Sequence, residues 1–131
     1  MNRLSLALRS GSLISKQITH KLSDGEDGRC AVGAIGLITG NDFYPNTTYF
    51  TDKRNSLQIE NLFKLFPQLD TKYLSPTSKY KLCLISIIVY LNDNKGWSRE
   101  KIADWIDTLY SDLPTYKVNE DIKESKEHAI Y

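Results

Sequence analysis

Cys30 is the residue of this chain best placed to do chemistry, because it opens a run of small residues that predicts the start of a helix. The run 29–36 (RCAVGAIG) follows a loop at 24–28 whose glycines and carboxylates suit the approach to a helix start. Backbone N–H groups at a helix N-terminus favour negative charge and can lower the pKa of a thiol. The sequence therefore allows two interpretations of Cys30, a nucleophile or a buried cysteine in a tightly packed helix.

A nucleophilic Cys30 needs a base and an orienting group, and the chain offers two of each. His20 or His128 would take the thiol proton, and Asp93 or Asn92 would orient the histidine. His20 lies in a segment of ambiguous structure and His128 in the C-terminal tail, so we expect the structural interpretation. A cysteine-dependent hydrolase or transferase using Cys30, His20 and Asp93 is kept as the alternative.

Asn92 and Asp93 also have structural interpretations of their own. Both residue types are common at a helix C-terminus and in the turn that follows. In a second interpretation, Asp93 reaches the N-terminus of the Cys30 helix and accepts hydrogen bonds from its free N–H groups. Its carboxylate would then raise the pKa of Cys30 and oppose formation of the thiolate.

Gly33 and Gly36 lie inside the same predicted helix. Glycine in a helix interior costs about 1 kcal/mol relative to alanine, so two of them indicate a close approach of another backbone. We predict that both glycines face a neighbouring element at a distance that a Cβ atom would not allow.

The segment 41–55 shows no helical period and carries several aromatic residues, which predicts a long irregular loop. Aromatic and arginine side chains on an exposed loop are typical of protein interfaces. Tyr44, Tyr49, Phe50 and Arg54 are therefore the predicted binding residues. In the alternative interpretation the rings fold back on the core as a lid.

Residues 96–103 (GWSREKIA) resemble the opening of a helix-turn-helix, which continues with a glycine-containing turn and a basic recognition helix. Residues 104–107 instead contain two aspartates and no glycine, and no basic helix follows. The net charge of +1 also argues against binding by broad phosphate neutralisation. A DNA-binding regulator with a degenerate helix-turn-helix at 96–110 is therefore only a further alternative, and we do not expect a nucleic-acid partner.

Hydrophobic periodicity and capping residues predict an all-α fold, a compact single-domain bundle of about five helices with the long aromatic-rich loop. Segment 12–23 fits either a helix or an extended chain. The apolar run 80–91 predicts a central helix, because it is longer than a typical strand and no comparable strand exists to pair with it. The predicted helices are 3–9 (ended by Gly11), 30–39, 56–66, 80–91 and one capped by Ser98 that reaches 110. The predicted core residues are Ile35, Leu37, Ile38, Leu84, Ile85, Ile88, Trp105 and Ile106.

The 131 residues are enough for one domain with its own hydrophobic core. We expect a helical domain at 1–110 and, where charges alternate in sign, a charged C-terminal tail at 111–131 packed weakly on it. Two distant cysteines without metal-ligand spacing predict neither a zinc site nor a disulfide, so we expect no metal, no cofactor and a cytoplasmic protein. The longest apolar run, 82–91, is shorter than the ~20 residues that span a bilayer, so no membrane partner is expected.

Small residues around Cys30 and a later polar pair form one pattern: Gly28-x-Cys30-Ala31-x-Gly33-Ala34-Ile35, then Asn92-Asp93 and Gly96 before a helix. The pattern resembles a family of small uncharacterised bacterial and phage domains. That family shows a Cys-Ala-Leu-Gly-Ala-Leu helix start and a later Trp-Asn-Asp element. Here Val32 and Ile35 replace the leucines, and Leu91 replaces the tryptophan. The resemblance, over about 4–109, implies a compact helical domain and no known activity.

Taken together, these patterns predict a small cytosolic accessory protein, of the kind that phages encode, which acts by binding a protein partner without catalysis.

Overall fold

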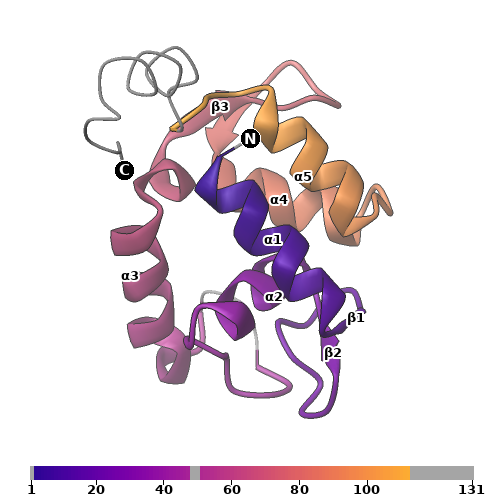
Figure 1. The fold of residues 1–131 in the computed structure, drawn as a ribbon, viewed down its shortest axis with the longest axis vertical. Coiled ribbons are helices and arrows are strands. Elements are labelled where there is room, and N and C mark those ends of the chain that lie inside the picture. The colour runs from indigo at the N-terminus through magenta and orange to yellow at the C-terminus, as the bar shows by residue number, and fades with distance from the viewer. Residues whose placement is uncertain (1, 48–50, 113–131) are drawn as a thin grey trace, which may run out of the picture.

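The computed structural model describes residues 2–47 and 51–112, and five α-helices dominate this part of the chain (Figure 1). The helices are α1 (Arg3–Leu13), α2 (Ala31–Ile38), α3 (Ser56–Leu65), α4 (Leu84–Asp93) and α5 (Arg99–Asp107). Two 3₁₀ helices, η1 (Lys53–Asn55) and η2 (Pro67–Asp70), flank α3. The expected number of helices is confirmed, and the predicted tail lies outside the described residues beyond Asp112.

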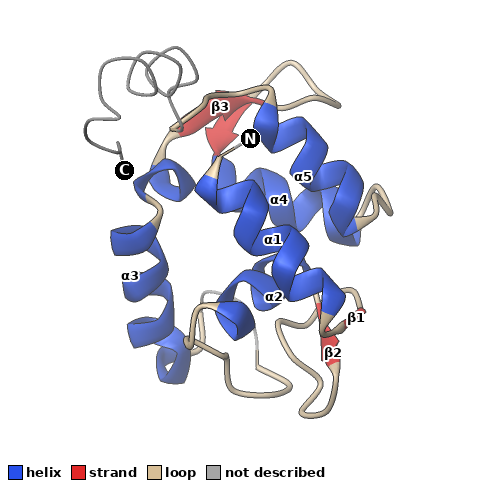
Figure 2. Ribbon diagram, in the orientation of Figure 1, coloured by secondary structure: helices blue, strands red, loops and turns tan. Residues whose placement is uncertain are grey.

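Four short strands correct the expectation of an all-α fold (Figure 2). The strands are β1 (Lys16–Gln17), β2 (Gly28–Arg29), β3 (Lys72–Leu74) and β4 (Lys81–Cys83). β1 pairs with β2 in parallel, and β3 pairs with β4 in an antiparallel hairpin. The strands have two or three residues each, which is too short to show the alternating pattern that identifies a strand in a sequence.

The core lies where α1 packs against α2 and α5 and where α2 packs against α4 (Figure 1). Five of the predicted core residues are buried there: Ile35, Leu84, Ile85, Ile88 and Ile106. The prediction was wrong for Ile38, which is exposed at the C-terminal end of α2, and Leu37 and Trp105 are only half-buried.

Gly11 does not end the first helix, because α1 continues through it to Leu13. A Cβ atom at Gly11 would overlap the backbone carbonyl of Ala34 in α2. The glycine therefore allows two helices to cross closely, and its conformational freedom is not used for a helix stop. The sequence alone does not separate these two uses of glycine.

The run 80–91 is not one helix, which is the largest correction to the predicted fold. Residues 81–83 form β4, paired with Lys72–Leu74, and α4 begins only at Leu84. The backbone N–H of Leu84 donates to the carbonyl of Thr71 at 2.9 Å, so the start of α4 is fixed by the hairpin. Apolar residues at 80 and 82 consequently belong to a projecting hairpin instead of the core.

Asn2 holds the first and last helices together. Its side-chain oxygen accepts the N–H of Ser5 at 2.8 Å and caps the start of α1. Its side-chain nitrogen donates to the carbonyls of Ile106 and Tyr110 at 3.2 and 3.0 Å, which satisfies acceptors at the end of α5. One buried amide therefore caps two helix ends of opposite polarity.

Arg99 joins the start of α5 to the end of α1. Its buried guanidinium donates to the carbonyl of Ser15 at 2.7 Å, to the hydroxyl of Ser15 at 2.8 Å and to the carbonyl of Arg29 at 3.3 Å. Burial lowers the pKa of Arg99 from its usual value. The guanidinium also donates to the carbonyl of Ser12 in the last turn of α1 at 3.4 Å, so its positive charge stabilises the junction between the end of α1 and β2.

Asp107 should make the fold sensitive to acid. Partial burial raises its pKa, but hydrogen bonds from Ser5, Arg9 and the backbone of Asn2 outweigh this and hold the pKa below its usual value. A carboxylate with a lowered folded-state pKa stabilises the fold above its unfolded pKa of about 3.9, and this contribution is lost as the pH falls through the folded value.

We therefore expect the Asp107→Asn variant to lose stability relative to the wild type at pH 7 and to lose less of it at pH 3. Urea unfolding at both pH values measures the difference. Asp104, which also contacts Arg9 but is largely exposed, gives the matched control Asp104→Asn. If the difference in unfolding free energy between the wild type and Asp107→Asn does not change with pH, the lowered pKa of Asp107 is contradicted.

Candidate functional site

Cys30 lies at the N-cap of α2 and is buried, with 1% of its surface exposed. Its Sγ atom accepts the backbone N–H of Gly33 at 3.4 Å. Desolvation is the main cause that raises the pKa of Cys30 to about 12, and the nearby Asp93 carboxylate adds to it. The helix N-terminus therefore does not produce a thiolate here, because burial outweighs it.

The structure does not assemble the cysteine, histidine and aspartate that the catalytic interpretation needs. The His20 side chain is exposed, and the residue contacts Asp93 through its backbone N–H, which donates to Asp93 Oδ1 at 2.9 Å. His128, the other candidate base, lies outside the described residues. A buried thiol and an exposed ring do not share the open cleft in which a cysteine nucleophile works.

Asn92 makes a contact with the start of α2. Asn92 is fully buried, and its Oδ1 atom accepts the backbone N–H of Ala31 at 3.1 Å and Nε2 of Gln17 at 2.8 Å. Its Nδ2 atom donates to the carbonyl of Ile18 at 2.9 Å and to Asp93 Oδ1 at 2.8 Å. Asn92 therefore forms a structural junction between α2, β1 and α4, and the expectation that Asp93 accepts free N–H groups of α2 stays a prediction.

Gly33 and Gly36 both meet a close neighbour. A Cβ atom at Gly33 would overlap the carbonyl oxygen of Leu22, and one at Gly36 would lie 2.7 Å from the Phe43 ring and 2.8 Å from the carbonyl oxygen of Asn41. The close approach predicted for both glycines is present. It holds the loops before and after α2 against the helix.

Gly33→Ala should therefore destabilise the fold by about 1–3 kcal/mol, even though alanine has the better helix propensity. The backbone of Leu22 cannot move aside as a flexible side chain can. Chemical denaturation measures the effect, and Ser86→Ala at an exposed position of α4 is the control for helix propensity. A Gly33→Ala variant as stable as the wild type would mean that the Leu22 loop shifts freely.

The helix-turn-helix alternative finds little support in the described residues. Ser98 caps α5 as predicted, since its side chain accepts the N–H of Lys101 at 3.1 Å. Beyond α5, however, no further helix occurs as far as Asp112. The exposed carboxylates of α5, at Glu100 and Asp104, contact Arg9. This face of α5 is acidic and is not suited to DNA phosphates.

The predicted binding loop is only partly described, because Tyr49 and Phe50 lie outside the described residues. Tyr44 is exposed, and the guanidinium of Arg54 lies 5.8 Å from the centre of its ring. Arg54 also pairs with Asp52 at 2.8 Å and holds the pKa of Asp52 below its usual value. Phe43 is buried against α2, so the described part of the loop combines one lid residue with one exposed ring.

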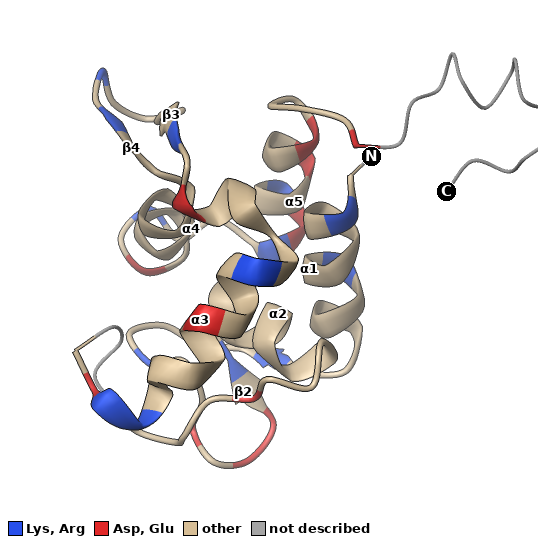
Figure 3. Ribbon diagram, turned by 90° about the vertical axis from the view of Figure 1, so that its left-hand side faces the viewer, with Lys and Arg blue, Asp and Glu red and all other residues tan. Residues whose placement is uncertain are grey.

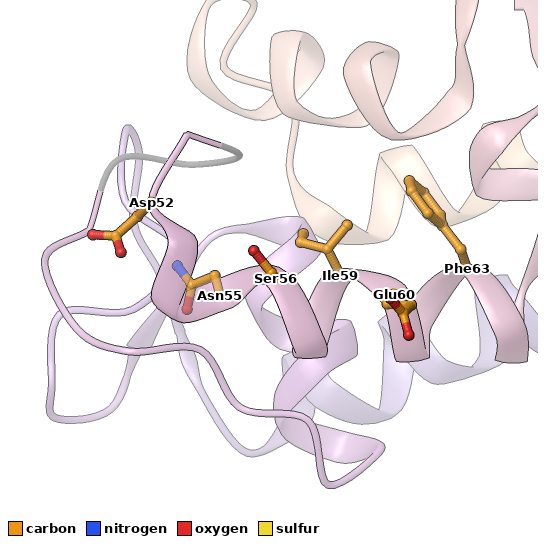
Figure 4. Close-up of a pocket in the computed structure, with 6 residues that line it drawn as sticks. All are labelled: Asp52, Asn55, Ser56, Ile59, Glu60 and Phe63. Atoms are coloured by element: carbon orange, nitrogen blue, oxygen red, sulfur yellow. The ribbon is translucent and has the colours of Figure 1, made fainter.

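A shallow hollow of about 290 Å³ lies beside this loop, along η1 and α3 (Figure 4). Its walls include Ile59 and Phe63, which point to the same side of α3. The polar groups at its other end already have partners: Asn55 binds Tyr44 and Thr47, and Asp52 binds Arg54. The hollow therefore combines an apolar wall with Asp52 and Asn55, whose polar groups are already engaged within the chain.

A second hollow, of about 250 Å³, was missed by the sequence analysis and lies between the β3–β4 hairpin and α4. We call it the hairpin surface, and its lining residues are Ser75, Ser78, Tyr80, Leu82, Ile87 and Tyr90. Tyr80, Leu82 and Tyr90 are 63%, 42% and 41% exposed. The missed signal is the set of lysines around this apolar segment, because a buried helix would not carry them.

Within the described residues, no group of three or more His, Cys, Asp or Glu side chains is arranged to hold a metal ion. None of the described helices has the length and apolarity that crossing a bilayer requires. Comparisons with known protein families, with curated proteins and with solved structures found no match to this chain. The family resemblance of the Cys30 segment therefore stays a prediction.

Proposed function

We propose that this chain is a small accessory protein that binds a protein partner through the hairpin surface and catalyses no reaction. The observation that carries the proposal is the gathering of Tyr80, Leu82 and Tyr90, each more than two-fifths exposed, around one hollow. Exposed aromatic and aliphatic side chains are seldom grouped in this way on the surface of a monomer. Where they are, the group commonly marks a site of interaction with a partner. The reduced cysteines favour the cytoplasm as its location, and the resemblance to phage domains fits an accessory role.

The state of Cys30 supports a non-catalytic role. A thiol that is buried and has a pKa of about 12 is almost entirely protonated at neutral pH, so it is a poor nucleophile. The half-buried Cys83 serves as an internal reference in the same molecule.

Alkylation of the native protein by iodoacetamide, followed by peptide mass spectrometry, tests this part of the proposal. We expect Cys83 to be modified first and Cys30 to be modified only after denaturation. Rapid modification of Cys30 at neutral pH in the folded protein would instead favour the cysteine-dependent hydrolase or transferase.

Affinity capture tests the binding surface itself. The wild type, the double variant Tyr80→Ser/Leu82→Ser and the control Leu57→Ser would be immobilised and exposed to an extract of the cells that produce the protein. Leu57 is as exposed as Tyr80 but lies on α3, so it controls for the loss of an exposed apolar side chain.

We expect at least one protein to be retained by the wild type and by Leu57→Ser and lost with Tyr80→Ser/Leu82→Ser, at unchanged melting temperature. Retention of the same proteins by all three chains would contradict the hairpin surface as the binding site. The Tyr44–Arg54 loop would then be the next surface to vary.

A further inference from the structure

The hairpin surface has an apolar floor and two aromatic walls. Tyr80 and Leu82 lie two residues apart, so they lie on the same face of β4 and its approach, and Ile87 and Tyr90 lie one turn apart on α4. Ile87 is buried at the base, while the two tyrosines are exposed at the edges. The only polar lining besides the tyrosine hydroxyls comes from Ser75 and Ser78. At about 250 Å³ the hollow is smaller than most small-molecule sites, so it fits one large side chain better than a cofactor.

The segment that forms this hollow carries positive charge and no negative charge. Residues 71–92 contain three lysines, at 72, 79 and 81, and no aspartate or glutamate. Lys79 is exposed and directly precedes Tyr80, and Lys95 Nζ lies 5.9 Å from the centre of the Tyr90 ring on the α4 side. Lys81 lies between Tyr80 and Leu82 and therefore on the opposite face of β4. Figure 3 shows the hairpin projecting from the helices with basic segments on it. No salt bridge involves these lysines within residues 2–47 and 51–112.

Two acidic residues flank this region. Asp70, at the base of the hairpin, lies 4.0 Å from the Sγ atom of Cys83. Asp93, at the end of α4, accepts hydrogen bonds from His20 and Asn92. The four lysines of residues 70–95 outnumber the two carboxylates, and this excess of positive charge complements a partner of negative charge.

We propose that the hairpin surface binds an acidic protein segment that places one large apolar side chain in the hollow between Tyr80 and Tyr90. The proposal rests on the proposed function and specifies the chemistry of the partner. The apolar side chain gains affinity by filling the hollow over Ile87. Asp or Glu residues beside it are attracted by Lys95 on the α4 side and, over a longer range, by the lysines of the hairpin.

Two features favour a protein segment over a nucleic acid, which could also use lysines and tyrosines. The hollow is lined by aliphatic Leu82 and Ile87 as well as by rings, and an aliphatic pocket suits a side chain better than a phosphate or a stacked base. The chain has a net charge of only +1, and phosphate-backbone binding depends on a larger excess of basic residues.

Selection from a random peptide library displayed on phage, with the immobilised full chain as bait, tests the proposed chemistry directly. We expect the selected peptides to contain an excess of Asp and Glu together with at least one Leu, Ile, Phe or Trp. The best peptide would then be labelled, and its affinity measured by fluorescence anisotropy against the wild type and three variants.

The first variant, Leu82→Ser, removes an apolar wall of the hollow. The second, Lys79→Glu/Lys81→Glu, reverses the charge beside it, and Lys53→Glu/Lys64→Glu makes the same change of charge around α3 as the matched control. We expect about ten-fold weaker binding for the first two, unchanged binding for the control, and a weaker charge effect at high ionic strength. Circular dichroism and melting temperatures confirm that each variant is folded.

Different outcomes separate the failure of this proposal from that of the proposed function. Suppose that the selected peptides need Leu82 but bind Lys79→Glu/Lys81→Glu as tightly as the wild type. The hairpin surface would then remain the binding site, but the proposal of an acidic partner would be overturned. Binding that neither variant weakens would overturn both. Failure to select any acidic peptide, or tighter binding of labelled oligothymidine than of the selected peptide, would also overturn the acidic protein partner.

Discussion

Replacing Asn92 with alanine is expected to destabilise the protein by about 2–5 kcal/mol, because the change leaves buried polar groups without partners. The backbone N–H of Ala31 and the carbonyl of Ile18 would each lose a hydrogen bond. Gln17 keeps its second bond, from Nε2 to the carbonyl of Trp97 at 2.9 Å, so it limits the loss. Chemical denaturation of purified protein measures the free energy of unfolding.

A second substitution at the same position separates hydrogen bonding from packing. Asn92→Asp has the same shape but replaces the donating amide with an oxygen that faces Ile18 O and Asp93. We expect it to cost at least as much as Asn92→Ala at pH 7, and to lose part of that cost at pH 4, where protonation restores a donor. Asn94→Ala, two residues later and exposed, is the control. A cost for Asn92→Ala no larger than for Asn94→Ala would contradict the structural junction.

Truncating Ile88 to alanine is expected to cost about 2–5 kcal/mol, because it removes buried methyl groups from the centre of α4 and leaves a cavity. Ile88 is fully buried within the core cluster. The matched control is Leu57→Ala on α3, an apolar truncation at an exposed position, which should change stability by less than about 0.5 kcal/mol. Equal effects at the two positions would mean that α4 does not lie at the centre of the core.

Where a helix begins was predicted best at positions with a strong local signal. Ser98 caps α5 and a helix begins directly after Cys30, both as the capping residues and the apolar periodicity predict. The division of 80–91 could not be predicted, because its β-branched and apolar residues suit a strand and a buried helix equally. What decides between them is pairing with Lys72–Leu74, a three-residue strand without a pattern of its own.

The same limit applies to the candidate sites. Asn92 and Asp93 are neighbours on a helix and point about 100° apart, so the sequence shows that a polar group meets the start of α2 without showing which one. Whether the thiol of Cys30 ionises depends on its burial, which is a property of the whole fold. Tyr80 and Leu82 were expected in a central helix, and only the hairpin reveals that they are exposed. Sequence patterns therefore located the structural residues around α2 better than they located a binding surface.

The double cap at Asn2 has a consequence for the order of folding. Its hydrogen bonds to Ile106 and Tyr110 join residues 104 and 108 positions apart, close to the largest separation within the described chain. These contacts close a loop that contains nearly every other element. Closing so long a loop costs chain entropy, so we expect these contacts to form after the elements within the loop. During synthesis α1 is made first, yet its partner α5 is made last among the helices, and the Arg9 face of α1 stays uncovered until then. We expect the contact between α1 and α5 to form last in folding, after α1 has packed against its sequence neighbour α2.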